Sequence, residues 1–267
     1  QVIDKKPLPG DVNSKFHEGG VVFSKDQNTV YFTANNYFQK EFLTDSAGIN
    51  MLQVFKASKD INGKWSEKVK LPFNNDNYSC GHPALSHDEK QLYFVSDMPG
   101  GYGLTDIYVV DILGDGTFSA PKNLGPKVNS QGGEMFPYVS EDNVLYFSSN
   151  GLPGYGELDI FASKIYDNSI SEPLNLGKPV NSEKDDFSFI IDDVKDRGFF
   201  SSNRDEGKGD DDIYSFLAKP GLYFHCVQQI TGVVRSESSG ALLPGASVEL
   251  RNSAGEVLET TTASATD

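Results

Sequence analysis

The residues of this chain best suited to bind a transition metal are four histidines and two cysteines. The histidines are His17, His82, His87 and His225. No two of them form a His-Glu-x-x-His pattern or another zinc spacing, so we expect no catalytic zinc. We interpret the neighbouring pair His82 and His87 as exposed turn residues. Cys80 and Cys226 either form one disulfide or are separate buried residues, and their number and spacing leave both alternatives open.

A cluster of carboxylates near residue 210 offers the oxygen ligands that calcium prefers. The cluster consists of Asp205, Glu206, Asp210, Asp211 and Asp212. Its spacing does not match the twelve-residue calcium loop, so calcium binding near Asp210 is the weaker interpretation. We expect Asp212 to tie down its own turn instead.

Nucleophile and phosphate-binding motifs are also missing from the sequence. It contains no Gly-x-Ser-x-Gly elbow, and its Gly-x-Gly turns are not followed by the helix of a phosphate-binding loop. The Ser-x-Asp triplets at 24–26, 86–88 and 140–142 are interpreted as Asx turns. We therefore assign no catalytic, cofactor-binding or metal-binding residue, and we predict a protein that is not an enzyme and uses no cofactor.

The elements that would position these residues repeat along the chain. Residues 91–97, 144–150 and 197–203 each place an aromatic pair before a serine and an aspartate or asparagine, and each segment begins 53 positions after the one before. An earlier copy lies at 29–35. It is followed by an insertion of nine residues, because Tyr31 to Gln53 spans 22 positions where Tyr93 to Asp106 spans 13. We place the insertion within 36–50 and expect it to project from the fold as a binding loop.

Each repeat predicts four short antiparallel strands separated by Gly-rich or Ser-x-Asp turns. Such a sheet cannot bury both faces alone, so the sheets must stack around an axis through their aromatic pairs. We predict an all-β fold: a β-propeller of four-stranded blades, with four repeats visible, followed by a partial β-sandwich module. Aromatics at 12%, with 26 glycines and 13 prolines, fit this prediction.

The first residues also carry a repeated signature. The Val-Asn-Ser triplet at 12–14 recurs at 128–130 and 180–182, which places residues 1–7 in an outermost strand. Either this strand completes the last blade and closes a four-bladed ring, or further blades lie upstream. We favour upstream blades, because large propellers usually have more than four.

Three segments are expected along the chain. Residues 1–219 form the propeller, 220–229 a linker, and 230–267 the beginning of a β-sandwich that we expect to be truncated.

The repeat at 82–108 resembles the TolB-type (WD40-like) propeller repeat. The run 16–216 looks like the propeller of OmpA-family envelope proteins of Bacteroidetes-type bacteria, and 232–262 resembles their carboxypeptidase regulatory-like module. The resemblance implies a periplasmic protein associated with the outer membrane. It also implies a non-enzymatic interaction scaffold in a peptidoglycan-linked assembly such as type IX secretion. Its partners would be envelope or secretion-system proteins, with peptidoglycan reached only through a C-terminal domain that this sequence does not contain.

Charge restricts the choice of partners further. With 23 Lys and Arg against 38 Asp and Glu, the net charge of −15 disfavours nucleic acid, and no segment has the apolar length of a membrane span. The alternative function is a propeller that hydrolyses glycans or peptides at an acidic site near its channel. That reaction needs carboxylates that converge outside the repeat, whereas the acidic residues here fall mostly at repeated turn positions.

Overall fold

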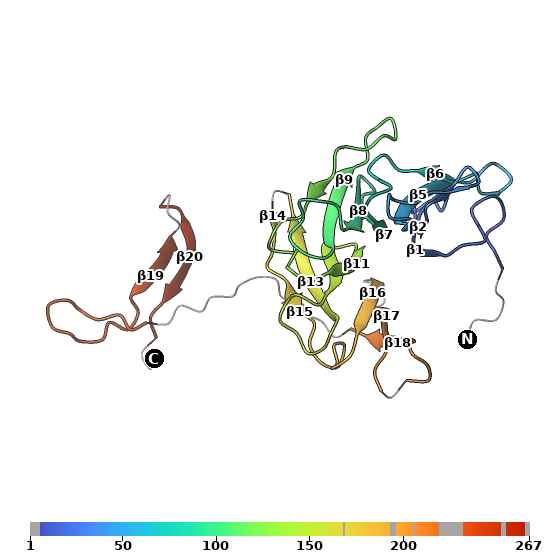
Figure 1. Cartoon of the computed structure of the whole chain (residues 1–267). Coiled ribbons are helices and arrows are strands. Elements are labelled where there is room, and N and C mark those ends of the chain that lie inside the picture. The colour runs from blue at the N-terminus through green and yellow to red at the C-terminus, as the bar shows by residue number, and fades with distance from the viewer. Residues whose placement is uncertain are drawn as a thin grey trace. The chain divides into compact units, whose positions relative to one another are not determined.

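The computed structural model describes residues 6–167, 169–192, 196–205, 207–218, 232–251 and 255–264. The chain divides into two compact units, Gln1–Phe224 and His225–Asp267. No described residue lies in a helix, and the first unit is a propeller arrangement of four small antiparallel sheets (Figure 1). The predicted all-β propeller is therefore confirmed.

The four sheets follow one another along the chain and are named blades 1 to 4. Blade 1 contains β1 (Glu18–Phe23), β2 (Thr29–Asn35), β5 (Leu52–Ser58) and β6 (Val69–Lys70). Blade 2 contains β7 (Cys80–Leu85), β8 (Gln91–Ser96), β9 (Asp106–Asp111) and β10 (Lys122–Asn123). Blade 3 contains β11 (Glu134–Val139), β12 (Val144–Ser149), β13 (Asp159–Tyr166), β14 (Ser169–Ile170) and β15 (Leu174–Asn175). Blade 4 has three described strands, β16 (Asp186–Asp192), β17 (Arg197–Ser202) and β18 (Asp212–Leu217).

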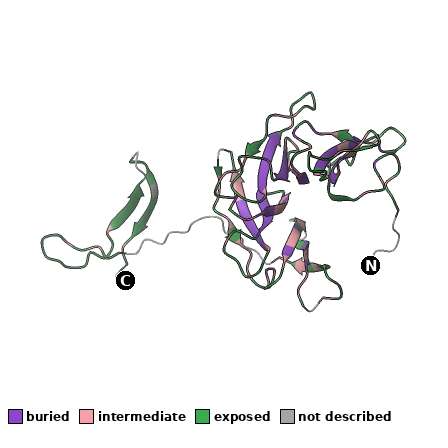
Figure 2. Ribbon diagram, viewed as in Figure 1, coloured by how far each residue is buried: buried purple, intermediate pink, exposed green. Residues whose placement is uncertain are grey.

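The aromatic pairs of the repeat form the cores between blades, because successive residues of a strand face opposite sides of its sheet. Tyr93 packs toward blade 3 and its neighbour Phe94 toward blade 1. The Phe94 ring stacks on that of Phe73, in the loop that leads from blade 1 into blade 2, with centroids 4.1 Å apart. A core of this kind lies at each of the three interfaces between successive blades. Figure 2 shows the strands of blades 2 and 3 as mainly buried.

The N-terminal residues pack on blade 1. Gly10 forms a β-bridge with Trp65, and Val12 is buried in the same cluster as Trp65 and Phe32. In the described part of the chain, β18 pairs with β17 alone, so residues 6–12 do not complete blade 4. Residues 1–5, which belong to the expected outermost strand, lie outside the described residues.

The described residues of the second unit include the hairpin of β19 (Ser247–Arg251) and β20 (Val257–Thr262) and an antiparallel bridge between Arg235 and Leu242, and every residue of β19 is exposed. The expected linker at 220–229 lies outside the described residues. The described residues include no helix with the length and apolar composition of a membrane span.

Replacing Leu92 with alanine tests the interblade core. Leu92 is fully buried between blades 1 and 2, so L92A should lower the free energy of unfolding by about 2–5 kcal/mol in urea denaturation. Leu104 lies in an exposed turn of the same blade, and L104A should change it by no more than about 0.5 kcal/mol. Equal effects of the two variants would contradict the stacked-blade core.

Candidate functional site

The first strand of every blade carries a β-bulge at the same place. β1, β7, β11 and β16 contact one another in turn around the axis, and each shifts register against its neighbouring strand (Figure 1). The backbone is left-handed at the four bulges, with φ of 46° at Gly20, 48° at His82, 52° at Phe136 and 54° at Ser188. Three of these residues are not glycine, which is uncommon, and a bulge re-aims its side chain.

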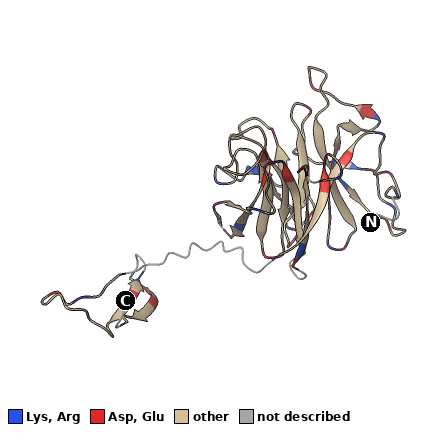
Figure 3. Cartoon of the chain, turned by 90° about the horizontal axis from the view of Figure 1, so that it is seen from below, with Lys and Arg blue, Asp and Glu red and all other residues tan. Residues whose placement is uncertain are grey.

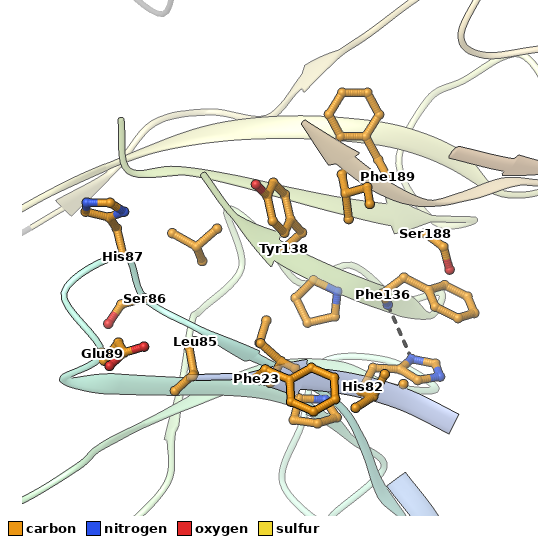
Figure 4. Close-up of a pocket in the computed structure, with 18 of the residues that line it drawn as sticks. Phe23, His82, Leu85, Ser86, His87, Glu89, Phe136, Tyr138, Ser188 and Phe189 are labelled. Carbon is orange, nitrogen blue, oxygen red and sulfur yellow. Dashed lines mark hydrogen bonds between the residues drawn. The ribbon is translucent and has the colours of Figure 1, made fainter. Parts of the chain in front are cut away.

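A pocket of about 370 Å³ lies among these four strands. Figure 4 shows Phe23, Leu85, Tyr138 and Phe189 around it, with polar residues on the turn after β7. Its lining is mostly apolar, so it fits an aromatic or aliphatic group better than a charged one.

His82 joins three blades beside this pocket. Its ring stacks on that of Phe136 with centroids 4.1 Å apart, and its Nδ1 lies 3.3 Å from the backbone N–H of Phe136, which donates to it. The backbone N–H of His82 donates to Thr33 Oγ1 at 2.8 Å. Burial lowers the pKa of His82 to about 4, so the ring is neutral near pH 7. The interpretation of His82 as an exposed turn residue is therefore wrong, because the bulge turns its side chain against blade 3.

The repeated aspartates hold turns by accepting backbone hydrogen bonds. Asp106 accepts from the N–H groups of Tyr102 and Gly103 at 2.7 and 3.1 Å. Asp212 accepts in the same way from Gly209 and Lys208, and these bonds lower its pKa. The expected turn-anchoring role of Asp212 is confirmed.

The described residues contain no group of three or more His, Cys, Asp or Glu side chains placed to hold a metal ion. Glu206, one member of the acidic cluster, lies outside them.

The Ser-x-Asp triplets are Asx-type turns, as expected. The hydroxyls of Ser24, Ser86 and Ser140 donate to Asp26, Asp88 and Asp142 at 2.6, 2.8 and 2.5 Å. Ser86 lines the pocket next to His87, yet its Oγ also accepts the N–H of Gln91 at 3.0 Å. Its hydroxyl is therefore engaged in the turn.

Sequence reasoning missed a buried carboxylate at the start of the inner strands. Glu134 accepts hydrogen bonds from the backbone N–H and the hydroxyl of Ser130, four residues earlier. Ser14 with Glu18, and Ser182 with Asp186, repeat this contact. The sequence signal for this contact is the serine of the Val-Asn-Ser triplet together with an acidic residue at a fixed distance after it.

Cys80 occupies the corresponding position of blade 2. It is completely buried, its Sγ lies 3.5 Å from Ser96 Oγ, and burial raises the pKa of its thiol to about 12. Cys226 lies outside the described residues.

The predicted insertion at 36–50 is a hairpin of β3 (Tyr37–Phe38) and β4 (Glu41–Phe42) with an ordered return to β5. Gln39 and Lys40 form its two-residue turn at φ of 50° and 67°, the backbone of a type I′ hairpin. Neither residue is the glycine or asparagine that usually occupies such a turn.

Asn50 and Asn36 fix the base of the insertion. The Asn50 side-chain oxygen accepts the backbone N–H of Asn36 at 3.0 Å, and its amide donates to the carbonyls of Leu43 and Asn36 at 2.6 and 3.1 Å. Asn36 is buried, and its side chain donates to Asp76 at 2.8 Å. The same carboxylate pairs with Lys70 at 2.7 Å, so the insertion is tied to blade 1 and to the loop that leads into blade 2.

Aromatic rings gather around this anchored hairpin, where Phe42 is exposed and Phe16 and Tyr37 are half-buried. Phe16 lies 4.9 Å from both Tyr37 and Phe42, measured between ring centroids. Lys15 places its Nζ 5.1 Å from the Phe16 centroid, and Phe42 is 48% exposed. We call Lys15, Phe16, Tyr37 and Phe42 the insertion cluster.

Basic and acidic residues are interspersed along the ribbon. In the view of Figure 3, Lys and Arg are scattered singly among Asp and Glu along loops and strand ends. That view shows none of the continuous basic stripe that a nucleic-acid backbone requires.

Comparison with known proteins gives likenesses of fold. No family model matches the chain, and no curated protein matches it. The structure is similar to putative TolB from Agrobacterium tumefaciens, with a TM-score of 0.49 and 13% identity over 78% of this chain and 64% of that one. It is also similar to endo-arabinase from Bacteroides thetaiotaomicron, with a TM-score of 0.46 and 14% identity over 76% and 75% of the two chains. A puromycin-hydrolyzing peptidase of Mycobacterium tuberculosis gives a TM-score of 0.44 and 18% identity over 70% of this chain and 25% of that one.

The chain thus spans 64% of the putative TolB structure. No family model supports the resemblance to the OmpA family or to the carboxypeptidase regulatory-like module.

Replacing His82 with asparagine should reduce the acid sensitivity of the fold. Because the pKa is about 4 when folded against an ordinary 6.5, neutral His82 stabilises the protein above pH 6.5, and this stability is lost as pH falls toward 4. The loss amounts to at most about 3 kcal/mol. Asparagine tolerates the left-handed backbone, so H82N should show a shallower fall in unfolding free energy between pH 6.5 and 4. The control S188N, at the equivalent bulge of blade 4, should keep the wild-type dependence of unfolding free energy on pH. An unchanged pH dependence in H82N would contradict the assignment of this acid sensitivity to His82.

Replacing Asn50 with alanine should loosen the insertion without unfolding the blades. The variant loses hydrogen bonds to Asn36 and Leu43, so amide exchange within 37–49 should accelerate about tenfold. Exchange in β8 should stay at the wild-type rate. T44A, at an exposed position of the same loop, is the matched control and should leave amide exchange in the loop at the wild-type rate. Wild-type exchange rates in N50A would show that other contacts hold the insertion in place.

Proposed function

We propose that the chain is a non-enzymatic protein-interaction scaffold of the bacterial cell envelope and that the insertion cluster is its contact with a partner. One observation carries the proposal: the hairpin is fixed at its base by Asn36 and Asn50, and its exposed Phe42 ring gathers with the half-buried Tyr37 and Phe16 rings beside the exposed Lys15. Rigid aromatic side chains contribute strongly to protein interfaces, because they bury much area at little entropic cost.

The envelope location rests on the resemblance of the repeat to OmpA-family propellers and of residues 232–262 to the regulatory-like module. In this proposal the chain is a periplasmic component of an outer-membrane assembly, comparable to PorE of type IX secretion. Its partners are envelope or secretion proteins, and peptidoglycan is bound by a separate C-terminal domain.

The alternative is a propeller that cleaves glycans or peptides. Glu89 and Glu141 both line the pocket between the inner strands, which is the observation in its favour. Glu89 already accepts a hydrogen bond from the backbone N–H of Lys25, which is a turn-holding role like that of the other carboxylates. The scaffold is therefore the better-supported function.

An affinity experiment with envelope extract of the producing bacterium tests the proposal. The chain should recover outer-membrane or secretion components, and the double variant Y37A/F42A should reduce recovery at least about tenfold. The matched control is Y102A/Y155A, which removes exposed aromatics from the corresponding turns of blades 2 and 3 and should bind normally.

An equal loss of recovered envelope components in both double variants would show that the binding surface lies away from the insertion. Turnover of a glycan or peptide by the purified chain, abolished by E89Q or E141Q, would replace the scaffold with the enzyme.

A further inference from the structure

A second pocket lies between blades 1 and 2, beside the outermost strand of blade 1. Its volume is about 540 Å³, and its walls are β5, β6 and the residues around them in blade 1 and residues 116–118 in blade 2. Val69, Leu71 and Phe118 give it an apolar lining, and Val69 is 58% exposed. Blades 1 and 2 share a core, so the pocket lies between two blades that pack directly on each other and does not depend on the outer face of blade 4.

The charge of this pocket is opposite to that of the chain. The net charge of the chain is −15, yet the described residues that line the pocket include Lys56 and Lys70 and neither aspartate nor glutamate. Asp76 compensates Lys70 at 2.7 Å. Among the described residues, the ammonium of Lys56 has no carboxylate partner and lies over the ring of Tyr31, with Nζ 5.9 Å from the centroid. The pocket therefore presents one positive charge that no described carboxylate compensates.

Lys56 departs from the repeat at a position that the next two blades use for packing. At successive steps of 53 residues, the equivalents of Lys56 are Val109 and Ala162, which are 7% and 0% exposed in the cores between blades. Lys56 is half-buried and lies opposite Tyr31 in the pairing of β2 with β5, so its stem can pack while its ammonium stays at the pocket. Packing of the repeat therefore does not require a lysine here.

Ser58 adds a second hydrogen-bond donor beside Lys56. The two residues are two positions apart on β5, so their side chains project from the same face of the strand, and both line the pocket. The Ser58 hydroxyl bonds to no other described residue, whereas the hydroxyl of Thr117 donates to Asp115 within its own turn at 2.6 Å. An ammonium and a hydroxyl placed in this way can donate to the two oxygens of one carboxylate.

We propose that this pocket binds a small amphipathic carboxylate. Its carboxylate accepts from Lys56 Nζ and Ser58 Oγ, and its aromatic or aliphatic body lies against Val69 and Phe118. Pockets of this size that bind small molecules are mainly apolar and carry a few polar groups that fix the orientation of the ligand. The ammonium supplies a charge-assisted hydrogen bond, and the apolar body gains by leaving water. This site goes beyond the scaffold function and shares no residue with the insertion cluster.

Titration of the whole chain with 4-phenylbutyrate, followed by the NMR shifts of backbone amides, tests the proposal. The wild type should show saturable shifts at 56–58 and 116–118, with a dissociation constant below about 1 mM. It should bind 4-phenylbutanol, which has the same apolar body and no charge, at least about tenfold more weakly, because the charge-assisted hydrogen bond is lost.

The variant K56M removes the charge of Lys56 and keeps an unbranched apolar stem. It should bind 4-phenylbutyrate at least about tenfold more weakly than the wild type, yet bind 4-phenylbutanol as the wild type does. Unchanged binding of the alcohol shows that the variant is folded. The matched control is K59M, which removes the ammonium that lies 4.9 Å from the centroid of the Trp65 ring in the same blade and should bind the carboxylate normally.

The absence of saturable shifts up to about 10 mM 4-phenylbutyrate would overturn the proposal. So would equal binding of the acid and the alcohol by the wild type, wild-type binding of the acid by K56M, or shifts confined to the pocket among the inner strands. Y37A/F42A, which tests the scaffold function, leaves Lys56 and Ser58 in place and should bind 4-phenylbutyrate normally, so the two proposals can fail separately.

Discussion

Both faces of each central blade are apolar, and a single antiparallel sheet has no second layer of its own to cover them. Stacking supplies that layer: Tyr93 and Ile107 are buried by blade 3, while Phe94 and Leu92 are buried against blade 1. The blades consequently depend on one another, and the turns between strands must hold each sheet at the correct angle. This explains why so many polar side chains serve the backbone. The aspartates of the repeat, the Ser-x-Asp turns and the buried acids such as Glu134 all accept hydrogen bonds from nearby amides or hydroxyls.

The residues of the repeat and the residues outside it therefore have different roles. Residues in the repeat register are committed to turns and cores, so residues with other roles must lie outside it. The insertion at 36–50 is one such place, since it belongs to blade 1 alone and is anchored by Asn36 and Asn50 without contributing to an interblade core. The inner strands are a second, because their bulges direct His82 and Phe136 toward the axis and border an apolar pocket. The backbone conformation of the bulges, and not a set of converging reactive groups, sets the positions of the side chains at this pocket.

The sequence predicted the features that depend on period. The 53-residue spacing gave the blades, their aromatic cores, the position of the insertion and the turn role of Asp212. It did not predict the bulges, because a left-handed residue in a strand has no reliable signature when it is His82 or Phe136 rather than glycine. The sequence therefore predicts an exposed turn at His82, where the structure has a bulged strand. The sequence also does not predict the partners of the serines in the Val-Asn-Ser triplets, since each contact joins a loop residue to the first residue of the following strand. The insertion cluster depends on Phe16 approaching Tyr37 and Phe42 across the fold, which spacing alone does not reveal.

The blades depend on one another for stability, and native-state amide hydrogen exchange under increasing urea tests this dependence most directly. If stacking stabilises the blades, the amides of β8, β9, β12 and β13 should exchange slowest and converge on a single unfolding free energy, since they share cores between blades 2 and 3 and their neighbours. β18, one face of which no described residue covers, should exchange faster. Four blades with four independent unfolding free energies, or β18 protected as strongly as β12, would contradict this account.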